Sequence, residues 1–144
     1  MTSGRAAGDS GTPLARKLGI RPGARVGLVA PPRNIDALLG ELPDGVVVRR
    51  RLTGRFDVIV AFATRRAELE DRFARLRAAL EEDGGLWVAW PKRSSGVETD
   101  LGDGPVREVG LAGGLVDNKV CSIDATWSGL RFVYRVADRG RAST

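Results

Sequence analysis

The stretch that constrains this chain most is Phe56–Arg93, FDVIVAFATRRAELEDRFARLRAALEEDGGLWVAWPKR. An apolar run over Asp57–Ala63 predicts a strand, and a second run over Leu86–Trp90 predicts another. A helix is predicted between them, from Thr64 to about Glu82, because apolar residues recur there at helical spacing: Leu69, Phe73, Leu76 and Leu80. Strand, helix and strand in this order predict a right-handed parallel βαβ unit, which places the chain in the α/β class.

The chain before this unit predicts two short helices, over 14–18 and 35–42, and two strands, over 24–30 and 46–48. The segment Arg49–Phe56 leaves two alternatives open. It is an extended link that returns to the other end of the sheet, or a hairpin with its turn at Thr53-Gly54. Eight extended residues span at most about 26–29 Å, which is enough for a return. We favour the link, because the rest of the chain alternates strand and helix.

A further helix is predicted between Asp100 and Ala112, followed by strands over Val116–Ile123 and Leu130–Val136. The short loop between these strands predicts an antiparallel pair. The fold class is therefore a three-layer Rossmann-like α/β sandwich, with a mostly parallel sheet of about six strands and an antiparallel C-terminal hairpin. Residues 12–136 are expected to form one domain, with a disordered tail over 1–11 and a C-terminal tail over 137–144.

Composition excludes several classes of chemistry. The chain has no histidine, which removes the usual general base near neutral pH and the commonest metal ligand. Its single cysteine, Cys121, lies within a predicted strand, where a small core residue is expected rather than a nucleophile. We therefore predict no catalytic residue, no metal site and no cofactor. Without a disulfide, a secretory signal or an apolar run of membrane length, the chain is expected to be cytoplasmic, with no membrane partner.

The net charge of +5 suggests an anionic partner. Nucleic acid is not favoured, because no block of five like charges occurs and aromatic residues are few. Basic residues instead follow four predicted strands, and the carboxyl ends of parallel strands meet at one edge of a sheet, here called the carboxyl edge. We expect an anionic ligand there, on a set of eight residues: Arg33, Arg49, Arg65, Arg66, Lys92, Arg93, Asp124 and Trp127.

Each member of this set has a simpler interpretation. The arginines and Lys92 are also what ordinary solvated loops contain. Asp124 is typical of a turn-forming aspartate, and Trp127 is typical of a ring that folds back over the core. Arg65 and Arg66 lie in the first turn of the predicted helix, where the helix dipole disfavours cations. That unfavourable placement is the observation that points beyond the simpler interpretation.

Four segments together resemble a small uncharacterised bacterial family of unknown function: TPLARKLGI, FDVIVAF, GGLWVAWPKR and GLVDNKVCSIDATWSGLRFV. The resemblance covers Thr12 to Val136 and implies no established activity. The layout is also similar to the core of S-adenosylmethionine-dependent methyltransferases. That similarity concerns the order of elements and does not establish chemistry.

The residues depart from a nucleotide-cofactor site in two places. The turn after the first strand, Ala30–Asn34, contains two prolines and no glycine, so it lacks close backbone approach and amide donors. Arginines stand at Arg49–Arg51, where a carboxylate would hold ribose hydroxyls. We therefore favour a non-catalytic domain that binds a small anion or a protein partner at the carboxyl edge. The alternatives are a diverged S-adenosylmethionine-dependent methyltransferase-like enzyme and an oligomeric scaffold; the oligomeric state itself is not predicted.

Overall fold

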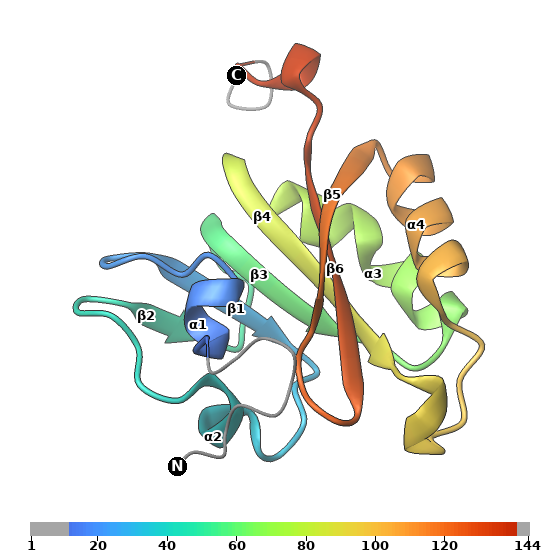
Figure 1. Cartoon of the computed structure of the whole chain (residues 1–144). Helices are drawn as coiled ribbons and strands as arrows, with labels where there is room; N and C mark the ends of the chain where they lie inside the picture. The colour runs from blue at the N-terminus through green and yellow to red at the C-terminus, as the bar shows by residue number, and fades with distance from the viewer. Residues whose placement is uncertain (1–11, 141–144) are drawn as a thin grey trace.

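The structure, a computed structural model, describes residues 12–140, and the predicted tail over 1–11 and residues 141–144 lie outside that range. The described chain forms one sheet of six strands in the order β2-β1-β3-β4-β6-β5 (Figure 1). The strands are β1 Arg25–Val29, β2 Val47–Arg49, β3 Phe56–Phe62, β4 Leu80–Pro91, β5 Leu115–Ser122 and β6 Trp127–Tyr134. The helices are α1 Leu14–Lys17, α2 Ile35–Leu39, α3 Arg66–Ala78 and α4 Asp103–Ala112, with short 3-10 turns η2 Arg93–Ser95 and η3 Val136–Asp138.

Two hydrophobic cores lie on opposite faces of the sheet. One packs α3 and α4 against it through residues such as Leu76, Val106 and Phe132. The other packs α1 and α2 against it through residues such as Leu18, Leu39 and Val60. Because both faces of β3 and of the later part of β4 are covered, residues 58–62 and 86–90 are continuous apolar runs rather than alternating ones. The arrangement confirms the predicted three-layer Rossmann-like sandwich.

The connection between β2 and β3 is the extended return link. Strand β1 pairs parallel with both β2 and β3, so the hairpin alternative is wrong. Arg25 holds the link: its guanidinium donates hydrogen bonds to the carbonyls of Thr53 and Arg55, both at 2.9 Å, and lies 4.7 Å from the centre of the Phe56 ring. Leu52 packs over Gly27, where a Cβ would come within 2.8 Å of its methyl group. The missing side chain of Gly27 therefore lets the link cross the face of β1.

The predicted end of the third helix is wrong. It was placed near Glu82, but α3 ends at Ala78 and β4 begins at Leu80. Leu80 fits both interpretations, since it continues the helical spacing and is also a fully buried strand residue paired with Phe56. The start of the strand is irregular, with a register shift opposite Phe56–Val58, so it lacks the alternation that would have identified it.

The C-terminal hairpin is antiparallel, as predicted, and it inserts β6 between β4 and β5. Its second strand, β6, begins at Trp127 rather than Leu130, so Trp127 and Ser128 belong to the sheet and not to the loop. No helix within residues 12–140 is long and apolar enough to cross a lipid bilayer.

Close helix–sheet packing at Gly110 of α4 predicts a sharp difference between two glycines of one helix. A Cβ at Gly110 would overlap the Phe132 ring, whereas a Cβ at Gly104 would meet no atom within 4 Å. Gly110→Ala should lower the free energy of unfolding by about 1–3 kcal/mol through overpacking. Gly104→Ala should change it by less than about 1 kcal/mol, because the backbone entropy that alanine saves in a helix is opposed by the clash of its Cβ with the following Pro105. Urea denaturation followed by circular dichroism measures both, and equal effects would contradict the packing.

Candidate functional site

The carboxyl edge of the parallel strands contains the topological switch point of the sheet. Strand β1 is followed by α2, which covers one face, and β3 is followed by α3, which covers the other. In open α/β sheets, ligands bind in the crevice that this divergence leaves. The loops at the switch point are 30–34 after β1 and 63–65 after β3. This edge is therefore the candidate site.

The backbone of the loop after β1 is unusual. Ala30 has φ +52°, and it is the only non-glycine residue with positive φ in the part of the chain that the structure describes. This left-handed conformation is sparsely populated by residues with a Cβ, and glycine normally supplies it. Strained backbone of this kind gathers at functional sites. The sequence shows no glycine here, yet the turn has the conformation that a glycine would provide.

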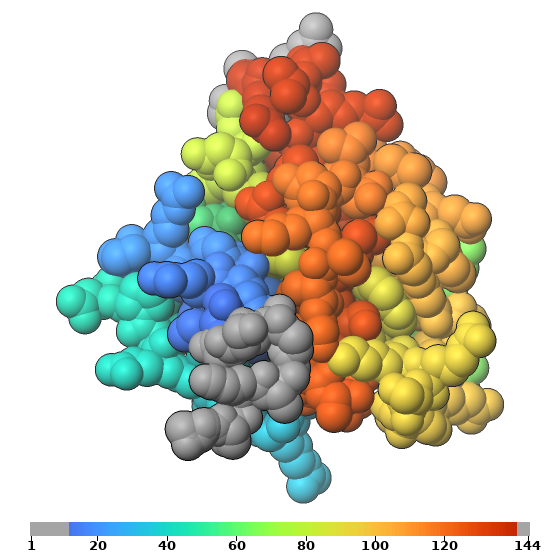
Figure 2. Space-filling model, viewed as in Figure 1, coloured from blue at the N-terminus to red at the C-terminus, as the bar shows by residue number. Residues whose placement is uncertain are grey.

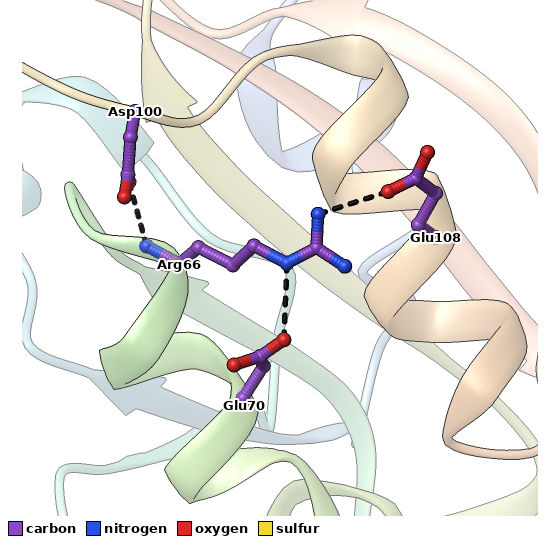
Figure 3. Close-up of polar contacts among 4 residues, drawn as sticks. All are labelled: Arg66, Glu70, Asp100 and Glu108. Carbon is purple, nitrogen blue, oxygen red and sulfur yellow. Dashed lines mark hydrogen bonds and ion pairs between the residues drawn. The ribbon is translucent and has the colours of Figure 1, made fainter.

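Carboxylates of the chain itself bind the positive groups at the start of α3 (Figure 3). Arg66 pairs with Glu70 at 3.0 Å and with Glu108 of α4 at 2.9 Å, and its backbone N–H donates to the Asp100 side chain at 2.7 Å. The hydrogen bonds that the Arg66 guanidinium donates to Glu108 and, second, to Glu70 raise its pKa. The helix N-terminus and Arg66 are thus both neutralised internally, which leaves neither available as a simple anion site.

The other basic residues of the predicted set do not converge. Lys92 reaches the β5–β6 hairpin, where its ammonium donates to the Ser122 hydroxyl at 2.6 Å and its backbone N–H to the Thr126 carbonyl at 2.7 Å. Figure 2 shows the segment after β4 lying beside the hairpin at this edge. Arg33 and Arg65 are exposed on separate loops, Arg93 is exposed at the start of η2, and Arg49 is exposed at the end of β2.

Asp124 and Trp127 have structural roles. The Asp124 carboxylate accepts hydrogen bonds from the backbone N–H groups of Thr126 and Trp127, at 2.9 and 2.8 Å, which is the geometry of a turn-forming aspartate. The Trp127 ring packs edge-to-face on Phe62, with centroids 5.0 Å apart. Both simpler interpretations from the sequence match these contacts.

Sequence reasoning missed a group of arginines beside this edge. Arg50, Arg51, Arg72 and Arg75 line one cavity, together with Val29 and Leu52. Glu68 and Asp71 lie four residues before Arg72 and Arg75 in α3, which is the spacing of a helical ion pair. Within residues 12–140, however, neither pair forms an ion pair. Their actual neighbours come from the return link, which no local pattern places beside α3. The structure holds no cluster of metal-binding side chains among the described residues.

Solved structures with the same fold are largely methyltransferases. A ribosomal protein L11 methylase from Lactobacillus delbrueckii subsp. bulgaricus superposes with a TM-score of 0.56 at 14% identity, covering 85% of this chain and 75% of that one. A TehB-like SAM-dependent methyltransferase from Corynebacterium glutamicum gives 0.54 at 18% identity, covering 90% and 91%. A putative methyltransferase from Thermoplasma acidophilum gives 0.55 at 10% identity, covering 87% and 75%. No family model and no curated protein matches the chain.

These comparisons correct the functional expectation. A non-catalytic domain that binds an anion or a protein partner was favoured, because the glycine turn and the carboxylate are missing. The structural neighbours support the methyltransferase-like alternative instead. At identities below 25% the likeness shows the fold, a Rossmann-like sandwich of the methyltransferase type, and it confirms the layout that the sequence suggested.

The contact between Trp127 and Phe62 predicts that Trp127 supports stability. Trp127→Ala should lower the free energy of unfolding by about 2–4 kcal/mol, since it removes a half-buried ring from the core. Trp127→Phe should lose less, because a phenyl ring can keep the edge-to-face contact, worth about 0.5–1.5 kcal/mol. Thermal and urea denaturation measure both variants. Unchanged stability in Trp127→Ala would instead favour a recognition role for the ring.

Proposed function

We propose that this chain is a diverged methyltransferase-like enzyme that binds S-adenosylmethionine at the carboxyl edge, between the loops after β1 and β3. The observation that carries the proposal is the fold: the sheet with antiparallel β6 between β4 and β5 superposes on the methyltransferases described above. The left-handed turn at Ala30 adds support, because it stands where a cofactor-binding glycine turn would lie. Membership of the small bacterial family that the sequence resembles remains a prediction.

The backbone of the turn fits this cofactor better than its side chains do. Ala30 provides the turn conformation, but Pro31 and Pro32 carry no N–H, so the amides of Arg33 and Asn34 are the donors left on the loop. When bound, S-adenosylmethionine supplies an electrophilic methyl group. These two amides would hold its polar end, and the apolar ends of β1 and β3 would exclude water from it.

The end of β2 fits the cofactor poorly. Arg49, an exposed arginine, occupies the position where a carboxylate would accept hydrogen bonds from the ribose hydroxyls. A lost charge-assisted hydrogen bond is worth roughly 1.5–3 kcal/mol, so affinity should be roughly 10–100-fold below that of a site with the carboxylate. The chain also has no histidine to act as a general base. A methyl acceptor that is already deprotonated at neutral pH therefore suits this edge best.

Isothermal titration with S-adenosylmethionine tests the proposal. We expect weak saturable binding to the natural chain and roughly tenfold tighter binding to Arg49→Glu, which restores the ribose acceptor. Arg16→Glu makes the same charge change on α1 and serves as the control, with no effect expected. S-adenosylhomocysteine should compete for the site.

Two outcomes would reject the proposal. The first is no binding to either the natural chain or Arg49→Glu while both remain folded by circular dichroism. The second is equal tightening in Arg49→Glu and Arg16→Glu, which would trace the effect to net charge rather than to a site. If binding is found, transfer of a radiolabelled methyl group to candidate acceptors is the next measurement.

A further inference from the structure

The arginine cavity, defined by Arg50, Arg51, Arg72 and Arg75, lies on the face of β1 between the return link and α3. Its volume is about 330 Å³, at the lower end of the range for small-molecule sites. The remaining lining residues are Val29, Leu52, Thr53 and Leu76, so an apolar floor lies beneath a basic rim. No acidic residue of the described chain lines it. By contrast, the cavity at the opposite edge of the sheet mixes Arg21 and Arg131 with Asp57 and Asp83.

Part of the lining of the arginine cavity is held in place without any ligand. Leu52 is anchored over Gly27, and Arg25 binds the carbonyls of Thr53 and Arg55 at 2.9 Å each. On the other wall, Arg72 is half-buried and donates a hydrogen bond to the Phe62 carbonyl at 3.2 Å. Residues that are already held in place lose little conformational entropy when a ligand binds, so less of the binding free energy is spent on ordering them.

The four guanidinium groups have no counter-charge of their own. Within residues 12–140 none of them forms an ion pair, although Asp71 and Glu68 are close to Arg75 and Arg72 in sequence. Four like charges around one small cavity repel one another and create a positive potential in it. An anion that enters relieves this repulsion. Planar guanidinium forks match the oxygens of a phosphate group, which they can bind through two parallel hydrogen bonds.

We propose that the arginine cavity binds a phosphorylated small molecule, with its phosphate groups on Arg50, Arg51, Arg72 and Arg75 and its apolar part on Val29, Leu52 and Leu76. Single carboxylates provide too little charge for four arginines, whereas a diphosphate or triphosphate matches them. The small volume favours a compact ligand over a polymer strand. Val29 immediately precedes Ala30, so a bound ligand would lie next to the candidate site on the carboxyl edge. The proposal concerns binding alone and holds whether or not that edge binds S-adenosylmethionine.

Isothermal titration with ADP, ATP, AMP and inorganic pyrophosphate, each at 0.15 M salt, tests the proposal. We expect the nucleotide diphosphate and triphosphate to bind more tightly than AMP, and pyrophosphate to bind more weakly than ADP because it has no apolar part. Arg51→Gln and Arg75→Gln should each weaken ADP binding by roughly 10–100-fold, as expected for the loss of one charge-assisted hydrogen bond. Arg16→Gln, with the same charge change on the opposite helical layer, should bind ADP like the natural chain.

The outcomes separate the proposal from its competitors. Equal weakening in Arg75→Gln and Arg16→Gln would show non-specific charge attraction and overturn it, as would no binding of any phosphorylated probe up to millimolar concentration. Single-stranded oligonucleotides whose affinity rises with length and exceeds that of ATP would overturn it in favour of a nucleic-acid surface. Circular dichroism of each variant confirms folding. Arg49→Glu changes no lining residue of the cavity, so a failed S-adenosylmethionine titration and a failed nucleotide titration remain distinguishable.

Discussion

The pairing of β3 with β4 is the constraint on which the rest of the fold depends. Residues 86–89 of β4 are completely buried, and β3 buries all its residues except Asp57. Strands with two covered faces need a helix layer on each side, and their pairing separates the two cores. The Trp87 indole N–H, hydrogen-bonded to the Leu18 carbonyl at 3.0 Å, ties α1 to this central strand. The switch point lies where β1 joins β3, because the helices that follow these two strands cover opposite faces of the sheet.

The sequence was informative wherever a signal was local. The runs over 57–63 and 86–90 predicted the central strands, and the Asp124 turn matched its local pattern. The end of α3 was mispredicted because Leu80 satisfies helical spacing and strand burial at once, and only its pairing with Phe56 decides between them. The site was harder to predict. Glu108 lies 42 residues from Arg66 in the chain, so no local sequence pattern predicts that its carboxylate pairs with that arginine.

Arginine has two different roles in this chain. In α3 and α4, Arg66 and Arg107 bind carboxylates of neighbouring elements, and these exposed pairs contribute little to stability. The arginine cavity is lined by four arginines and by no carboxylate of the described chain. The net charge of +5 therefore does not show where the positive potential lies. The start of α3 and the arginine cavity differ in whether each arginine has a carboxylate beside it. Composition alone could not separate a neutralised helix start from the arginine cavity, which is lined by two later arginines of the same helix.

The return link also has a mechanical consequence. Strand β2 has three residues and lies at the edge of the sheet, where it pairs with β1 alone. An edge element this short opens easily, and its amide protons should exchange with solvent far sooner than those of β3. Val47 donates its N–H to the Ala24 carbonyl at 2.9 Å, so that amide reports directly on the opening. A ligand held between Arg51 and Arg75 would join the link to α3 and slow the exchange. Ligand binding in the cavity and opening of β2 are thus thermodynamically linked, so that a ligand which binds the closed form stabilises this end of the sheet.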